Sequence, residues 1–140
     1  MIVTVTLNPS IDRTAPIAGP LRRGQVNRLG SSTEVAAGKG VNISRVLRGA
    51  GIETCAVVPA GAKGRLTLGL NHDDIPHQVV PVAAAVRTNL TITEPDGTTT
   101  KINEPGADLS PEELTAVEEA IVEKSSGAQW VVLSLSLIHI

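Results

Sequence analysis

Aromatic side chains are almost missing from this chain of 140 residues, which has no phenylalanine, no tyrosine and one tryptophan, Trp130. A surface that stacks the bases of single-stranded nucleic acid needs aromatic rings, so this class of function is disfavoured. Apolar residues still make up 41% of the sequence. The core is therefore expected to consist of valine, leucine, isoleucine and alanine, which is typical of buried parallel strands and their covering helices.

An excess of charge is also missing, because 12 lysines and arginines stand against 14 aspartates and glutamates, for a formal net charge of −2. Nucleic acids and anionic membranes attract basic surfaces, so neither is an expected partner. Arg22, Arg23 and Arg28 form only a local basic cluster. No apolar run is long enough to cross a membrane, and residues 2–7 lack the basic start of a signal peptide.

Cysteine is represented by Cys55 alone, which lies in the apolar run at residues 54–58. Such a cysteine is expected to be a small buried hydrophobic residue, and its isolation fits a protein of the reducing cytoplasm. His72, Asp73 and Asp74 are adjacent in the sequence, but no other ligands are spaced to complete a metal site. We therefore expect no metal to be bound there.

A glycine-rich turn at residues 36–42 leads directly into a predicted helix, whose apolar face is expected to carry Ile43, Val46, Leu47 and Ala50. Glycine lets a ligand approach the backbone, and the first turn of a helix offers unpaired N–H groups. An anionic or hydroxyl-rich ligand is favoured there, although a tight connection without a ligand is the alternative. The spacing matches neither a Walker A loop nor the dinucleotide-binding fingerprint.

The remaining pattern alternates between strands and helices. Strands are expected at residues 2–7, 54–58, 78–82 and 130–134, and helices at residues 63–71 and from Ser110 to about Ile121. Short strands at residues 14–35 and a hairpin at residues 87–103 complete the pattern, which predicts an α/β fold with a doubly wound sheet. Asp12 is placed just beyond the first strand, where it either accepts hydrogen bonds from a ligand or caps a turn.

Four motifs occur together and in a fixed order along the chain. They are Asn-Pro-Ser-Ile-Asp at residues 8–12, Gly-Lys-Gly-Val-Asn at 38–42, Arg-Thr-Asn at 87–89 and Lys-Ile-Asn-Glu-Pro-Gly at 101–106. Together they resemble the ribokinase-like (PfkB-type) carbohydrate kinases, most strongly the bacterial 1-phosphofructokinase branch. The resemblance covers residues 1–134 and only the front half of the family's usual chain. It implies a ribokinase-like doubly wound sheet with a small β-sheet lid, formed by residues 14–35 and 87–103.

The resemblance also implies roles for individual residues. Positions that bind the sugar correspond to Asp12, Gly38, Lys39, Gly40 and Asn42. Arg87 corresponds to the arginine that grips the phosphate already present on the substrate, a task suited to a planar fork of donors, with Asn89 and Lys101 as assisting residues.

The reaction implied by the resemblance is transfer of the γ-phosphoryl group of ATP, with Mg²⁺, to fructose 1-phosphate, which gives fructose 1,6-bisphosphate. Kinases of tagatose 6-phosphate or fructose 6-phosphate are alternatives within the family, because they bind a phosphorylated ketohexose through the same residues. A non-catalytic sugar-phosphate-binding module is the alternative from another class. The resemblance further implies a homodimer formed through the lid.

The sequence departs from the family in three places. The helix start Gly-Ala-Gly-Asp that carries the catalytic aspartate is missing, and the nearest string, Gly106-Ala107-Asp108, lacks the second glycine. We therefore expect no catalytic, cofactor-binding or metal-binding residue in these 140 residues, and no activity of this chain alone. Leu135 replaces a family glycine, so residues 135–140 are expected to be a non-native tail, and Ala37 stands where many relatives have glycine.

Overall fold

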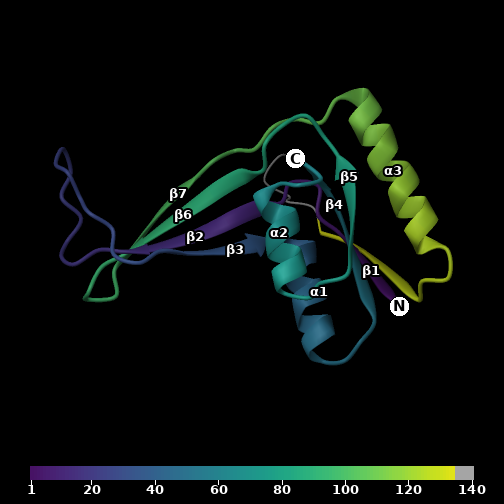
Figure 1. The fold of residues 1–140 in the computed structure, drawn as a ribbon, viewed down its shortest axis with the longest axis horizontal. Coiled ribbons are helices and arrows are strands. Elements are labelled where there is room, and N and C mark those ends of the chain that lie inside the picture. Colours follow the sequence, from purple (N-terminus) through teal and green to yellow (C-terminus); the bar gives the residue numbers. More distant parts are fainter. Residues whose placement is uncertain (135–140) are drawn as a thin grey trace.

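In the computed structural model, which describes residues 1–134, the chain forms two four-stranded sheets and three helices (Figure 1). The first sheet is wholly parallel, with the order β5-β4-β1-β8. Its strands are β1 (Ile2–Val5), β4 (Thr54–Ala60), β5 (His77–Pro81) and β8 (Trp130–Leu133). The helices are α1 (Lys39–Gly49), α2 (Arg65–His72) and α3 (Pro111–Ser125).

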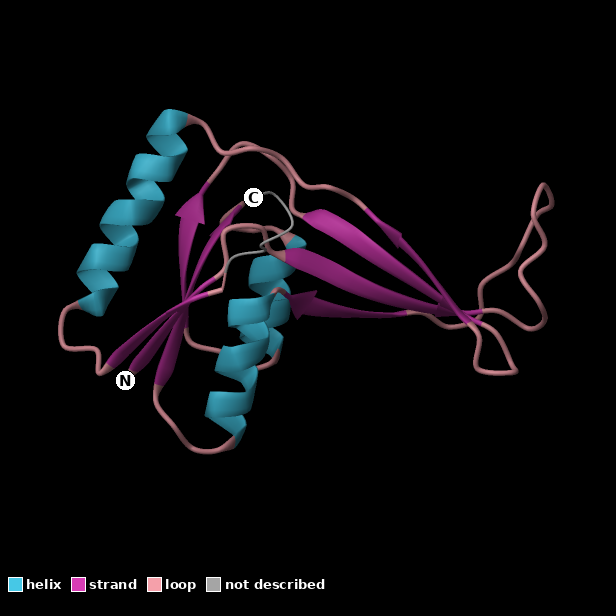
Figure 2. Ribbon diagram, turned by 180° about the vertical axis from the view of Figure 1, so that it is seen from behind, coloured by secondary structure: helices cyan, strands magenta, loops and turns pink. Residues whose placement is uncertain are grey.

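The second sheet has the order β3-β2-β6-β7 and extends to one side of the first (Figures 1 and 2). Its strands are β2 (Ser10–Pro16), β3 (Thr33–Ala37), β6 (Arg87–Thr93) and β7 (Thr99–Asn103). Strand β2 pairs parallel with β6, whereas the β2–β3 and β6–β7 pairs are antiparallel. Strands β2 and β6, which are distant in the sequence, therefore pair in the middle of this sheet.

Helices cover both faces of the first sheet, as the predicted doubly wound fold requires. Side chains alternate along β4, so that Ala56 and Val58 pack with Leu66 and Leu70 of α2, whereas Val57 packs in a cluster with Val117 of α3. Cys55 is buried, as expected, and burial raises the pKa of its thiol. The core is thus made of small and aliphatic side chains in two layers.

Local signals predicted several elements correctly. Helix α3 begins with the capping box, in which the amide of Glu113 donates to the Ser110 hydroxyl and the amide of Ser110 donates to the Glu113 carboxylate. The hairpin β6–β7 turns at Asp96 and Gly97, where Gly97 has a φ of 90°. Strand β4 is longer than predicted, because it continues through Pro59 to Ala60.

Two predictions about the second sheet are wrong. Asp12 does not follow the first strand in a turn, since it lies inside β2 and is paired with Val35 of β3 and Asn89 of β6. The lid sheet accordingly begins at Ser10, and residues 17–32 contain only an isolated bridge between Ile17 and Leu29. Pairing with β6, far along the chain, makes residues 10–16 a strand despite the preceding Asn8-Pro9.

Two predictions about burial are also wrong. Helix α1 buries Gly40, Val41 and Ser44, whereas Val46 is 71% exposed and Ala50 is exposed as well. Strand β8, predicted to be buried, has Trp130 70% exposed, because within the described residues it pairs only with β1. The predicted tail at residues 135–140 lies outside the described residues. None of the helices described is long and apolar enough to cross a membrane.

A chain of buried hydroxyl groups joins α1 to the first sheet. Thr54 Oγ1 donates to the carbonyl oxygen of Ile2 at 2.9 Å and lies 2.9 Å from Ser44 Oγ, which lies 2.7 Å from Thr4 Oγ1. Each hydroxyl has one proton, so Ser44 must donate to Thr54 and Thr4 must donate to Ser44. The directions of all three hydrogen bonds are therefore determined.

Ser44→Ala is expected to lower the free energy of unfolding by about 2 kcal/mol, because the buried Thr4 hydroxyl loses its acceptor. Adding Thr4→Val removes the unsatisfied donor, so the double variant is expected to recover part of this loss. Denaturant unfolding of both variants measures the two values. A double variant that is less stable than Ser44→Ala would contradict the inferred direction of the hydrogen bonds.

Candidate functional site

One face of the second sheet collects most of the predicted site residues. Paired residues on neighbouring strands point to the same face, and residues two apart on a strand do likewise. Asp12 is paired with Asn89, Ser10 with Arg87, and Lys101 with Thr91. Asp12, Arg87, Asn89 and Lys101 therefore share this face, whereas Ile11 and Ala36 point to the other face and are buried in the core below.

Asp12 is held at one of its two carboxylate oxygens. Its Oδ1 accepts hydrogen bonds from Ser10 Oγ at 2.9 Å and from Asn89 Nδ2 at 3.0 Å. Ser10 is buried, and no role for it was predicted from the sequence. Its spacing of two residues from Asp12 would have revealed it, had residues 10–16 been predicted as a strand. The arrangement leaves Oδ2 to accept hydrogen bonds from hydroxyl groups of a ligand.

The guanidinium group of Arg87 is held by two backbone carbonyls. Nη1 donates to the carbonyl oxygen of Glu104 at 3.3 Å, and Nη2 donates to that of Asn8 at 3.4 Å. Both hydrogen bonds are long, and Nε is enclosed without a partner among residues 1–134. A phosphate would offer this charged fork stronger hydrogen bonds than the two carbonyls do.

Three of the four motifs contact one another around Arg87. Besides the contacts of Arg87 itself, Asn8 Nδ2 donates to the carbonyl oxygen of Pro105 at 2.9 Å. The carboxylate of Glu104 accepts from the amide of Thr88 at 2.7 Å, which links the end of β7 to the start of β6. Glu104 and Asn8 therefore support Arg87, a role that their places in the sequence did not indicate.

The glycines of the remaining motif, at residues 38–42, allow α1 to pack closely on β1. A Cβ atom on Gly40 would lie 2.6 Å from Thr6 Oγ1 and 2.7 Å from the carbonyl oxygen of Val5. Gly38 has a φ of 135°, and a Cβ there would overlap the Thr6 side chain. Thr6 Oγ1 also accepts from the amide of Val41 at 3.1 Å. Close packing of α1 on β1 therefore requires glycine at both positions. The predicted role of these glycines in ligand approach stays a prediction.

The other residues of this motif are exposed. Asn42 lies in the first turn of α1, and its Oδ1 accepts a hydrogen bond from Arg45 Nη1 at 2.8 Å. Lys39 and Lys101 are exposed too, and neither forms an ion pair or hydrogen bond with another described side chain. Both lysines are thus available to attract an anionic ligand.

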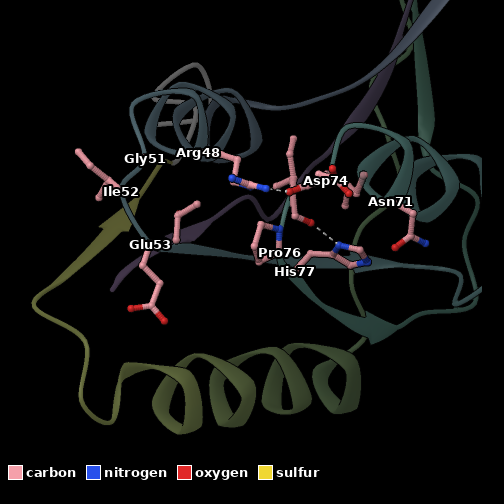
Figure 3. A pocket seen from close by; sticks show the side chains of 11 residues that line it. Arg48, Gly51, Ile52, Glu53, Asn71, Asp74, Pro76 and His77 are labelled. Carbon is pink, nitrogen blue, oxygen red and sulfur yellow. Dashed lines mark hydrogen bonds between the residues drawn. The ribbon is translucent and has the colours of Figure 1, made fainter.

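A cavity with a volume of about 610 Å³ (Figure 3) is lined by none of these residues. Its lining includes Thr54 and His77, where β4 and β5 begin, and Arg48, whose Nε donates to the carbonyl oxygen of Asp74 at 3.1 Å. Ligands of parallel α/β sheets bind at the carboxyl ends of strands, and this cavity is at the amino ends. The polar face of the second sheet is therefore the better candidate site.

The chain is similar to known proteins in both sequence and structure. No protein-family model matches the chain. The 1-phosphofructokinase of Vibrio cholerae is 31% identical over 97% of the chain and 43% of its own length, and that of Xanthomonas campestris is 35% identical over 96% and 43%. The crystal structure of phosphofructokinase-2 from Escherichia coli in complex with fructose-6-phosphate matches with a TM-score of 0.85 and 28% identity, over 95% of this chain and 44% of that one.

The chain thus spans less than half the length of the relatives it matches. Its two sheets and three helices superpose on the N-terminal part of a solved phosphofructokinase, and the curated relatives agree in sequence over the same part. The resemblance of this chain to the N-terminal part of the ribokinase-like phosphofructokinases is therefore confirmed in both sequence and fold.

Proposed function

We propose that residues 1–134 are the sugar-phosphate-binding part, lid included, of an ATP-dependent kinase that converts fructose 1-phosphate to fructose 1,6-bisphosphate. The observation that carries the proposal is the shared face of β2 and β6, on which pairing places the carboxylate of Asp12 and the guanidinium group of Arg87. The names of the two curated relatives support fructose 1-phosphate as the substrate.

The spacing of these groups suits a small sugar phosphate. Arg87 lies two residues before Asn89, the partner of Asp12, and residues two apart on a strand are separated by about 6.6 Å. In this proposal Asp12 accepts hydrogen bonds from sugar hydroxyls, while Arg87, aided by Lys101, binds the phosphate. Exposed apolar side chains of the lid, such as Ile102, offer the surface for a homodimer.

The resemblance to the kinases implies ATP and Mg²⁺ for the whole enzyme. Within residues 1–134 no group of three histidine, cysteine, aspartate or glutamate side chains is arranged to hold a metal ion. Gly106-Ala107-Asp108 lies in the connection between β7 and α3, not at the start of a helix. We therefore assign the nucleotide and the catalytic base to polypeptide other than residues 1–134.

Two other functions have support of their own. The relative from Escherichia coli was crystallised with fructose-6-phosphate, which favours the 6-phosphates of fructose or tagatose as alternative ligands. A non-catalytic sugar-phosphate-binding protein is the second alternative, because the described residues supply candidate binding groups for a sugar phosphate but no cluster of three metal-ligating side chains.

Calorimetric titration of the 140-residue chain tests the proposal. We expect fructose 1-phosphate to bind more tightly than fructose 6-phosphate, tagatose 6-phosphate, fructose or inorganic phosphate, and we expect no turnover with ATP and Mg²⁺. Equal binding of fructose 1-phosphate and inorganic phosphate would contradict a sugar site. Turnover above background would contradict the assignment of the catalytic base to other polypeptide.

A further inference from the structure

The amide group of Asn42 is held in one orientation. Arg45 lies one turn further along α1, and its Nη1 is 2.8 Å from Asn42 Oδ1. A guanidinium group only donates hydrogen bonds, so it must face the amide oxygen and not the NH₂ group. Asn42 is exposed, so its Nδ2 is left to face solvent or a ligand.

Arg45 is itself fixed by two further elements. Its Nη2 donates to the carbonyl oxygen of Ala36 in β3, and to Oδ2 of Asp73, which caps the C-terminus of α2, at 3.1 Å. The side chains of Arg45 and Asp73 are 33% and 28% exposed, so solvent screens this ion pair less than a fully exposed one. Hydrogen bonds from His72 and Arg45 hold the pKa of Asp73 below its usual value.

We propose that Arg45, held by Asp73, is a positioning residue that makes Asn42 a hydrogen-bond donor in the sugar site. The ligand must then present an acceptor oxygen to Asn42. Asp12 imposes the opposite requirement, because a carboxylate only accepts hydrogen bonds and the ligand must therefore present a donor to it. Its partner Asn89 already donates to it from an NH₂ group. The inference rests on the proposed function and on the sugar-binding position that the resemblance implies for Asn42. It states that one hydroxyl group of a ketohexose phosphate accepts a hydrogen bond from Asn42, whereas another donates one to Asp12.

Analogues of fructose 1-phosphate test this polarity. Fluorine in place of a hydroxyl group accepts a hydrogen bond but cannot donate one, and hydrogen does neither. For the hydroxyl that faces Asn42, we expect the fluoro analogue to bind the wild-type chain about threefold to tenfold more tightly than the deoxy analogue. For the hydroxyl that faces Asp12, we expect both analogues to bind equally weakly.

Variants of Arg45 connect the polarity to the proposed cause. Arg45→Met is expected to abolish the preference for the fluoro analogue, and Arg45→Gln, which retains an NH₂ donor, is expected to restore it. Arg48→Gln is the matched control in the next turn of α1, and it should leave the preference unchanged. A preference that survives Arg45→Met would overturn the inference, whereas a wild-type chain that binds no sugar phosphate would overturn the proposed function.

NMR of the chain without ligand decides the inference independently of binding. The ¹⁵N and ¹H resonances of the Asn42 side-chain amide are expected to shift in Arg45→Met and to return toward the wild-type positions in Arg45→Gln. Amide resonances that do not respond to Arg45→Met would show that Arg45 does not orient Asn42, and the inference would fail.

Discussion

Gly40→Ala is expected to lower the free energy of unfolding by about 3 kcal/mol, at the upper end of the usual cost of overpacking a core. The added methyl group would lie within 3 Å of the carbonyl carbon and oxygen of Val5 as well as Thr6 Oγ1. Backbone atoms of a central strand cannot move aside as a flexible side chain does. A loss of this size would lower the melting temperature by about 10 °C, which thermal unfolding followed by circular dichroism measures.

Gly49→Ala is the matched control in the same helix. Gly49 is the last residue of α1, and nothing lies within 4 Å of the position its Cβ would take. Alanine favours helix more than glycine does, so this variant is expected to be neutral or more stable by about 0.5 kcal/mol. Equal losses in the two variants would show that contact between α1 and β1 is not the cause.

Arg87→Met is expected to weaken the binding of fructose 1-phosphate by about 100-fold, or about 3 kcal/mol, because hydrogen bonds between charged groups are lost. Arg87→Lys keeps the charge but lacks the planar fork, so a smaller loss of about tenfold is expected. Calorimetry with fructose 1-phosphate and with unphosphorylated fructose measures both effects. Only the phosphorylated sugar should respond.

Arg65→Met provides the control for a lost arginine. Arg65 is exposed and forms a surface ion pair with Glu34, at 2.8 Å, away from the face that carries Arg87. Its replacement should leave the affinity for fructose 1-phosphate unchanged. If Arg87→Met weakened the binding of fructose and fructose 1-phosphate equally, Arg87 would have a structural role and not a phosphate-binding one.

Signals that depend on a few neighbouring residues were reliable in the sequence. The capping box at Ser110 and Glu113 and the turn at Asp96 and Gly97 each form from groups within four residues of one another. Their geometry follows from local hydrogen bonds and backbone preferences, which a short stretch of sequence contains. The alternation of strands and helices likewise identified the doubly wound fold, because each apolar pattern needs a partner surface.

The candidate site was predictable in its residues but not in its arrangement. The resemblance to the kinases selected Asp12 and Arg87, but their placement on one sheet face depends on the pairing of β2 with β6. The break predicted at Asn8-Pro9 is present between β1 and β2, but local sequence did not indicate that a strand resumes at Ser10, because that strand depends on long-range pairing. Ser10 and Arg45 were missed for the same reason, since their roles appear only when distant strands and helices meet.

By itself, then, the sequence determined the class of fold, the local caps and turns, and the kind of groups available to bind a sugar phosphate. Only the tertiary structure decided that Gly38 and Gly40 serve the packing of α1 on β1, and that Asn42 is oriented by Arg45. The physical reason is that close packing and hydrogen-bond direction depend on atoms brought together across the chain, which no short stretch of sequence contains.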